Sequence, residues 1–223
     1  MCFSAEADFV GAAVVGAIGV ATLTEPHSRR ELPLAALPLG FAAHQAAEGF
    51  VWLDLEGHLP ASAGRVALYA YVLYAWALLP LLVPLSILLV EPLRSRRRWI
   101  GALLAIGAAV GLYLTWAMTD DGIAARISGH TLEYTGAGAH ADLVTVLYVI
   151  ATCGAFLISS HRRIVIFGAL NLSAVVFLAW VRADAVTSLW CAWAAVASLL
   201  VYFHFARRRE PATVPEEVPV YRR

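Results

Sequence analysis

The sequence contains no lysine, so all sixteen of its basic side chains are arginines. This absence excludes a covalent retinal pigment, because retinal needs a lysine amine to form its Schiff base. Charge is scarce as well: 14% of the residues are charged, whereas 61% are hydrophobic. Such a composition predicts an integral membrane protein in a lipid bilayer. We expect no nucleic-acid partner.

Cysteine is also scarce, because Cys2, Cys153 and Cys191 are the three in the chain. They are too scattered to indicate a disulfide framework or a cysteine-rich zinc module. Cys2 and Cys191 are both expected near the external face, where a disulfide could persist. Two free thiols, or one thiolate ligand, are equally open. The chain has no CxxC, HExxH or HxxxH motif.

Seven apolar stretches approach the length needed to cross a membrane, which is about 20 residues of helix. They lie at 9–23, 32–53, 66–90, 100–118, 143–159, 164–181 and 186–205. This pattern predicts an all-α polytopic membrane protein with a single bundle of seven transmembrane helices over residues 1–205. The remainder, 206–223, mixes prolines with charged residues and is expected to be a disordered cytoplasmic tail.

The arginines are distributed unequally between the two faces of such a bundle. Thirteen fall in the first, third and fifth loops and the tail, whereas the other face has Arg65, Arg126 and Arg182. Because short arginine-rich loops stay cytoplasmic, this asymmetry predicts an external N-terminus and a cytoplasmic C-terminus. Adding or removing one helix would destroy the alternation. The expected location is the plasma (inner) membrane, with multiple passes.

Polar side chains interrupt the second apolar stretch, at His44, Gln45 and Glu48. An ionisable group in hydrocarbon is costly and usually faces the bundle interior or a water-filled cavity. His44 and Glu48 are four residues apart and therefore share one face of a helix. The carboxylate could orient the imidazole, or both could hold one metal ion. The structural alternative is a buried hydrogen bond between them that stabilises helix packing.

The connection at 119–142 is the longest and lies on the predicted external side. Its alternating residues Thr131–Thr135 predict a short strand or hairpin that folds over the bundle mouth. With Cys2 on the same side, this predicts an external-facing pocket in which Glu48 is the catalytic residue. The predicted metal is zinc or copper. Its candidate ligands are His44, Glu48, His130, His140 and Cys2.

A ligand of this pocket would be a small molecule or a lipid. The candidate ligand-binding residues are Gln45, Tyr74 and Trp190, although aromatic side chains also form the belt expected at membrane surfaces. Pro80 and Pro84 should kink the helix at 66–90, and a kink can open a pocket.

Two further patterns concern helix packing. Gly107 and Gly111 form a GxxxG motif, which permits close contact between helices but also arises by chance in glycine-rich helices. Asn171 and Ser198 are expected to bond to neighbouring helices rather than to a ligand. Cys153 is expected to be a packed apolar residue.

Several short motifs resemble a bacterial family of seven-helix membrane proteins of unknown function, over residues 1 to about 205. The chain opens with MCFSA, and QxxEG followed by Trp52 lies in the second helix. The other matching positions are Gly129, His130, the SSHRR run at 159–163, Asn171, Trp190, Cys191 and His204. The resemblance implies a single seven-helix domain and carries no activity with it.

A looser resemblance is to the membrane hydrolases that include alkaline ceramidases and progestin-receptor-like proteins, which have an intramembrane zinc. Their paired histidines in the last helix are missing, since the stretch at 186–205 has His204 alone, at the opposite face from Glu48.

Two classes of function follow from these residues. As a membrane-embedded hydrolase, the protein would use Glu48 or a metal to activate water. As a non-enzymatic transporter, sensor or ligand- or cation-binding protein, it would use the same pocket to bind its ligand or relay a proton. Few polar residues lie in the last two helices, which favours a one-sided site over a channel.

Overall fold

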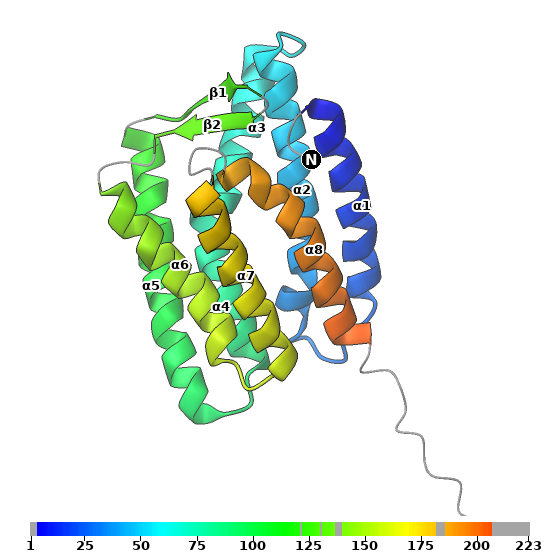
Figure 1. Cartoon of the computed structure of the whole chain (residues 1–223), viewed down its shortest axis with the longest axis vertical. Helices are drawn as coiled ribbons and strands as arrows, with labels where there is room; N and C mark the ends of the chain where they lie inside the picture. The colour runs from blue at the N-terminus through cyan, green and yellow to red at the C-terminus, as the bar shows by residue number, and fades with distance from the viewer. Residues whose placement is uncertain (1–3, 121, 130, 137–139, 182–185, 207–223) are drawn as a thin grey trace, which may run out of the picture.

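The computed structural model describes residues 4–120, 122–129, 131–136, 140–181 and 186–206, and these form seven long helices and one hairpin. The helices run roughly along the long axis of the molecule (Figure 1). Their bounds are α1 Ala5–Leu23, α2 Leu32–Leu55, α3 Ala61–Val72, η1 Leu73–Leu78, α4 Leu79–Val90, α5 Arg94–Asp120, α6 Ala141–Ile158, α7 Arg162–Val181 and α8 Val186–Ala206. Here α3, the π-helical turn η1 and α4 form one continuous helix, Ala61–Val90.

The seven predicted stretches are confirmed as helices. The largest difference in a bound is at α5, which begins at Arg94 rather than at Ile100. The first helix also begins earlier than predicted, at Ala5, because the Ser4 hydroxyl accepts a hydrogen bond from the Ala7 amide and caps it. The predicted tail lies outside the described residues, apart from the last residue of α8.

Several helices carry apolar side chains on the outside of the bundle. Within the described residues, four are long and apolar enough to cross a membrane: α1, Ala61–Val90, α5 and α6. Val10, Leu112 and Trp116 are all more than half exposed. Membrane localisation is therefore plausible for this bundle.

The GxxxG motif of α5 is a packing contact. A Cβ atom at Gly107 would collide with the carbonyl oxygen of Pro80, and one at Gly111 would collide with that of Ala77. The two glycines therefore let the α5 backbone approach η1 and α4, as GxxxG spacing allows.

The π-helical turn η1 lies immediately before the predicted proline kink. The Leu79 amide donates to the Tyr74 carbonyl, five residues back, instead of to Ala75. Pro80, the next residue, has no N–H to donate. The Ala75 carbonyl instead accepts a hydrogen bond from the Tyr148 hydroxyl of α6, at 2.8 Å. Hence α6 supplies the donor that this helix lacks.

At the end of the bundle where α4 and α6 end, the buried carboxylate of Glu91 joins two connections. It accepts hydrogen bonds from the Ser160 amide at 2.8 Å, the Leu93 amide at 3.1 Å and the Ser159 hydroxyl at 3.3 Å. Burial raises the pKa of Glu91, but these hydrogen bonds outweigh it and lower the pKa below its ordinary value. The ionised carboxylate therefore stabilises this end of the bundle.

Two arginines at the start of α5 complete the same structure. Arg96 donates to the Ile158 and Ser159 carbonyls, and Arg97 donates to the Leu88 and Glu91 carbonyls. These carbonyls belong to the ends of α6 and α4, which lack intrahelical donors. Arginine side chains thus act as C-terminal caps across different helices.

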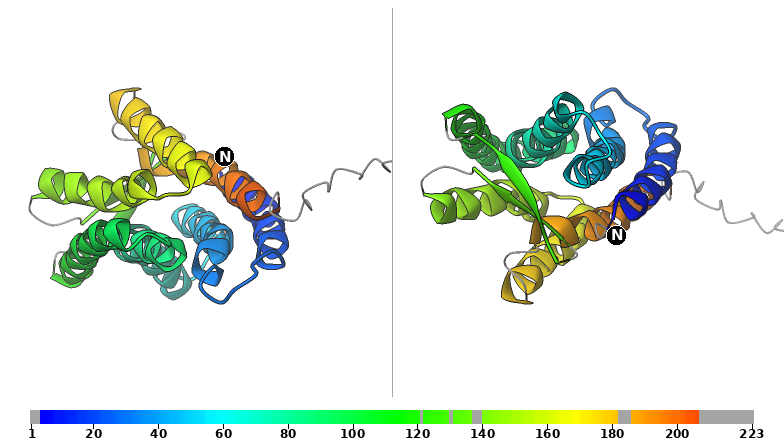
Figure 2. Two further views of the ribbon diagram at one scale, coloured as in Figure 1. Left: turned by 90° about the horizontal axis from the view of Figure 1, so that it is seen from below. Right: turned by 90° about the horizontal axis from the view of Figure 1, so that it is seen from above.

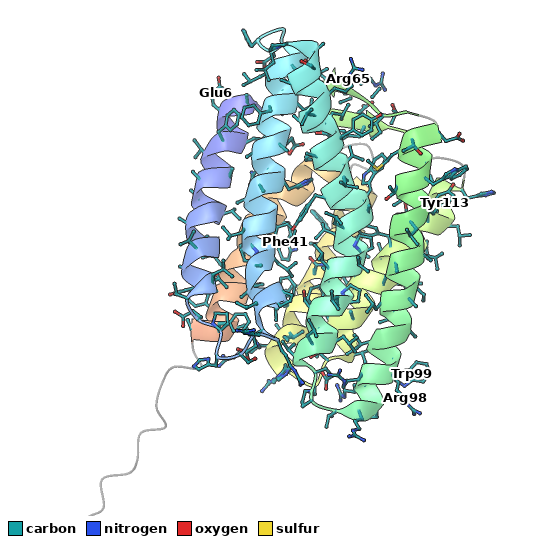
Figure 3. All side chains as sticks on the ribbon, turned by 180° about the vertical axis from the view of Figure 1, so that it is seen from behind. Glu6, Phe41, Arg65, Arg98, Trp99 and Tyr113 are labelled. Atoms are coloured by element: carbon teal, nitrogen blue, oxygen red, sulfur yellow. The ribbon has the colours of Figure 1, made fainter. Side chains whose placement is uncertain are left out.

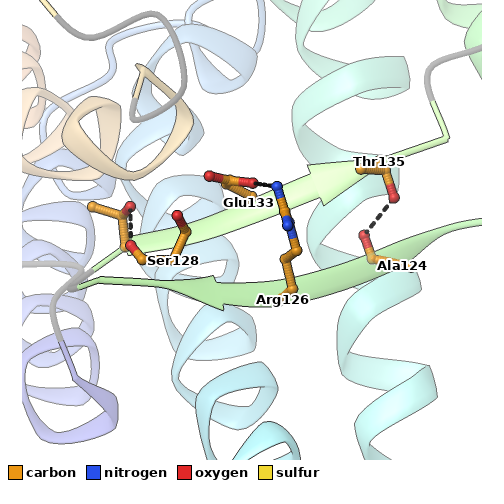
Figure 4. A network of polar contacts seen from close by, with 6 residues as sticks. Ala124, Arg126, Ser128, Glu133 and Thr135 are labelled. Atoms are coloured by element: carbon orange, nitrogen blue, oxygen red, sulfur yellow. Dashed lines mark hydrogen bonds and ion pairs between the residues drawn. The ribbon is translucent and has the colours of Figure 1, made fainter.

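The predicted hairpin is confirmed at the opposite end. Strands β1 (Ala124–Ser128) and β2 (Thr131–Thr135) pair antiparallel, and Arg126 forms an ion pair with Glu133 across them (Figure 4). The hairpin crosses the end of the bundle, as the view from above shows (Figure 2). Leu132 is buried in a cluster with Ala5, Trp52 and other apolar residues of α1, α2 and α3. This cluster anchors the hairpin to the helices.

Candidate functional site

The Glu48 carboxylate lies in α2 beneath the hairpin and is completely buried. Its Oε1 atom accepts hydrogen bonds from two tyrosine hydroxyls, Tyr71 of α3 at 3.1 Å and Tyr134 of β2 at 3.3 Å. The burial of an acid in an apolar bundle requires such partners. Glu48 therefore connects α2 and α3 to the hairpin.

His44, one helical turn before Glu48, is held by ring stacking. Its imidazole stacks on the Tyr71 ring, with 3.9 Å between the ring centroids. The Tyr71 ring also stacks on that of Tyr134, with 4.6 Å between their centroids. The Nδ1 atom of His44 has no hydrogen-bond partner among the described residues. Tyr71 thus contacts both members of the predicted His44 and Glu48 pair, through its ring face and its hydroxyl respectively.

Gln45 faces a different helix from His44. Its amide lies against Gly11 of α1, where a Cβ atom would collide with it. The side chain is buried, and neither amide atom has a hydrogen-bond partner among the described residues. Asp8, three residues before Gly11, is also completely buried.

Asp8 is a buried acid that the sequence interpretation did not single out. The available signal was the spacing of small and polar residues along α1, at intervals of three or four. These buried positions are Ala5, Asp8, Gly11, Val15, Gly19 and Thr22. A stripe of small residues marks the face on which a neighbouring helix packs, and Asp8 belongs to it.

Tyr74, predicted to bind a ligand, packs on α2 instead of projecting into open space. A Cβ atom at Gly40 would collide with its hydroxyl, and its ring centroid is 5.2 Å from that of His44 and 6.1 Å from that of Phe41. The hydroxyl has no hydrogen-bond partner among the described residues. The third predicted ligand-binding side chain, that of Trp190, lies outside the described part of the structure.

The predicted metal ligands are only partly described. His140 is exposed and directly precedes α6, with a positive φ of 63°, whereas Cys2 and His130 lie outside the described residues. Within the residues that the structure places, no group of three His, Cys, Asp or Glu side chains gathers as a metal site would require. Binding of zinc or copper is therefore not supported by this part of the chain.

A cavity of about 310 Å³ lies inside the bundle. Its walls come from α2, the continuous helix Ala61–Val90, α5, α6, α7 and α8. The lining residues include Phe41, His44, Trp76, Val83, Phe156, Phe167, Asn171, Trp193, Ala197 and Val201. His44 contributes to this wall, while Glu48 and Gln45 do not. The predicted single pocket on His44 and Glu48 is thus divided: one residue lines a cavity and the other is enclosed under the hairpin.

Polar side chains around the cavity mostly bond to one another or to the backbone. Asn171 donates to the Cys153 sulfur at 3.4 Å and accepts from the Trp193 indole N–H at 2.8 Å, so it joins α6, α7 and α8 as expected. The Thr152 hydroxyl donates to the Tyr148 carbonyl at 2.9 Å. Trp193 was not predicted, although it lies three residues after Trp190 and hence on nearly the same helix face.

The fold and the cavity define a helical-bundle protein whose apolar helices could span a membrane. Within that class, the chain belongs to a family of unknown function, DUF6629, whose family model matches residues 1–216. This confirms the resemblance to an uncharacterised family. The search of curated proteins found no match, and the search of solved structures found none either.

Proposed function

We propose that this protein is a multi-pass membrane protein that binds a small lipid-soluble molecule in its central cavity. The observation that carries the proposal is the cavity itself, about 310 Å³ in volume and walled mainly by apolar side chains. This volume is near the lower end of the range for ligand pockets, roughly 300–1,000 Å³. An apolar site inside an apolar bundle suits a ligand that arrives from the bilayer.

The proposed orientation has the N-terminus outside the plasma membrane. Eight of the ten arginines in the described residues lie at the end of the bundle where α5 and α7 begin. Figure 3 shows Arg98 and Trp99 at this end, and Glu6 and Arg65 at the other. By the positive-inside rule, the arginine-rich end faces the cytoplasm. A reporter fused to the C-terminus should be active in the cytoplasm, and activity outside the cell would overturn this orientation.

A ligand-binding role is favoured over hydrolysis by the position of Glu48. A general base must reach the proton that it removes, whereas Glu48 is completely buried beneath the hairpin, bonded to two tyrosines and absent from the cavity wall. The cavity therefore supports binding better than Glu48-dependent catalysis.

The cavity contains its own reporters, because Trp76 and Trp193 line it. We would titrate the purified protein with 1-bromooctane, whose bromine quenches tryptophan fluorescence, and compare two neighbouring variants. Ala197 is buried in the cavity wall, whereas Val196 is 45% exposed on the outside of α8. The variant Ala197→Phe places a phenyl group in the cavity and reduces its volume, and Val196→Phe adds a phenyl group outside it.

Saturable quenching is expected in the wild type and in Val196→Phe, and it should be lost or weakened at least several-fold in Ala197→Phe. Non-saturable quenching by probe dissolved in detergent is common to all three proteins and cancels in the comparison. Equal saturable quenching in both variants, or none in the wild type, would refute binding in this cavity.

A further inference from the structure

We propose that the outer face of α5 binds an anionic phospholipid, with the lipid phosphate on Arg94 and Arg98 and the acyl chains along the exposed apolar side chains that follow them. This inference rests on the multi-pass membrane topology proposed above and is independent of what the cavity binds. It depends on three features: an apolar stripe of membrane length, tryptophans at both of its ends, and two arginines with no role inside the protein.

The stripe runs along the side of α5 that faces away from the bundle. Its exposed positions recur every three or four residues and therefore share one face of the helix. They are Arg98, Ala102, Ala105, Ala109, Leu112 and Trp116. The opposite side, which includes Leu103 and Gly107, is buried. From Arg98 to Trp116 the helix rises about 27 Å, at 1.5 Å per residue, which is close to the roughly 30 Å of a hydrocarbon core. The stripe is thus long enough to meet lipid chains across the bilayer.

Tryptophan side chains lie at both ends of this stripe. Trp99 directly follows Arg98 and is 67% exposed (Figure 3), and Trp116 is 58% exposed at the other end. Exposed tryptophans are enriched where hydrocarbon meets the lipid headgroups. In the proposed topology, Arg98 and Trp99 therefore lie at the depth of the headgroups.

Arg94 and Arg98 differ from the two arginines between them. Arg96 and Arg97 donate to backbone carbonyls at the ends of α6 and α4. The side chains of Arg94 and Arg98 are exposed, and they form no hydrogen bond or ion pair among the described residues. Being four residues apart, they share a helix face.

These two arginines do not stabilise α5 itself. The helix macrodipole favours anions near the start of a helix and disfavours cations there. The first turn of α5 nevertheless has no acidic residue, so the chain supplies no compensating charge within it. An external anion bound to Arg94 and Arg98 would supply the missing negative charge.

An anionic phospholipid matches both parts of this face. Guanidinium groups bind phosphate oxygens through paired, charge-assisted hydrogen bonds, and anionic headgroups are attracted to arginines at the membrane surface. A zwitterionic phospholipid has the same phosphate but also an ammonium group, which the arginines repel. A free phosphate ion has no part that contacts the stripe. The face should therefore prefer an anionic lipid to a zwitterionic one.

Trp99 can report this preference, because it is exposed beside Arg98. We would reconstitute the full chain in vesicles that contain phosphatidylglycerol or phosphatidylcholine brominated near the carboxyl end of an acyl chain. Bromine quenches tryptophan fluorescence, and each protein is measured with and without Trp99→Phe to isolate the signal of Trp99. The variants are Arg98→Gln and the double variant Arg94→Gln/Arg98→Gln. The matched control is Arg65→Gln, because Arg65 is exposed at the opposite end of the bundle (Figure 3).

In the wild type, phosphatidylglycerol should be preferred at Trp99 by about fivefold or more, as expected for arginine at a membrane surface. This preference should fall at least about twofold in Arg98→Gln and nearly vanish in the double variant, while Arg65→Gln retains it. Quenching by phosphatidylcholine should stay unchanged, which shows that the variants are folded with α5 against lipid. Replacing chloride by phosphate at equal ionic strength should leave the preference intact.

Three results would overturn the inference while leaving the topology in place. They are equal quenching of wild-type Trp99 by both lipids, an equal loss of preference in Arg65→Gln and Arg98→Gln, and loss of the preference in phosphate buffer, which would indicate a site for the free ion. If neither lipid quenches Trp99 in the wild type, α5 does not face lipid, and the proposed topology fails together with the inference. The 1-bromooctane titration tests the cavity separately.

Discussion

The hydrogen bond between Tyr134 and Glu48 should determine how firmly the hairpin is held on the bundle. Tyr134 lies in β2, and its hydroxyl is 3.3 Å from Glu48 Oε1. The substitution Tyr134→Phe removes this hydroxyl and retains the ring that stacks on Tyr71. The perturbation therefore isolates one polar contact between the hairpin and the helices.

The magnitude follows from the burial of the acceptor. A single hydrogen bond contributes about 0.5–1.5 kcal/mol, and about 1.5–3 kcal/mol when one partner is charged. Glu48 keeps the bond from Tyr71 in the variant, so the loss should be at the lower part of this range. We expect about 1–2 kcal/mol, which corresponds to a roughly five- to thirtyfold change in the equilibrium for opening of the hairpin.

Amide hydrogen exchange measures this opening directly. The backbone amides of Ala124–Ser128 and Thr131–Thr135 should exchange about five- to thirtyfold faster in Tyr134→Phe, while those in the middle of α5 stay unchanged. The matched control is Tyr69→Phe, because Tyr69 is 38% exposed on α3. This control removes the same atom at a site away from Glu48.

Equal exchange of the hairpin amides in Tyr134→Phe and Tyr69→Phe would refute the reasoning. It would mean that Leu132 and its apolar neighbours hold the hairpin without help from Glu48. Faster exchange throughout α5 would also contradict it, because the effect would then be global destabilisation.

Two further predictions concern the packing and the polar end of the bundle. Gly107→Ala should lower the free energy of unfolding by about 1–3 kcal/mol, because its methyl group collides with the Pro80 carbonyl. The control Gly101→Ala, in the same helix with nothing nearby, should be neutral or slightly stabilising. If thermal unfolding shows the same loss of stability in both variants, the packing argument is wrong. Because hydrogen bonds lower the pKa of Glu91 from about 4.5, its ionised form adds stability above that pH, and the stability is lost as the pH falls through the lower folded-state pKa. In thermal unfolding, the stability of the wild type should exceed that of Glu91→Gln most near neutral pH. The difference in stability should shrink below about pH 4.5, and a difference that does not depend on pH would contradict this prediction.

Local features of the chain were predictable from the sequence. Helix positions follow from the lengths of the apolar runs, because a segment without water must satisfy its backbone groups internally. The hairpin follows from the alternation at Thr131–Thr135. The GxxxG motif was a weak inference, because this spacing often arises by chance. The contact of Gly107 with Pro80 in the structure shows that here it is a packing motif.

The candidate site was predictable only in part. The cost of polar groups in hydrocarbon identified His44, Gln45 and Glu48 as buried, and all three are. Their shared spacing did not show that each faces different surroundings: the cavity for His44, α1 for Gln45 and the hairpin for Glu48. Helical periodicity states which residues share a face, but the neighbouring elements decide what that face meets.

The sequence by itself therefore determined the number and approximate limits of the helices, the short hairpin and the presence of buried polar groups. These properties depend on residues close together in the chain. Tertiary structure alone decided that Tyr71 and Tyr134, 23 and 86 positions away, bond to Glu48. It also decided that Tyr148 supplies the donor missing at Pro80 and that six helices line a cavity beside His44. Such contacts join distant segments, and the packing of whole helices brings them together.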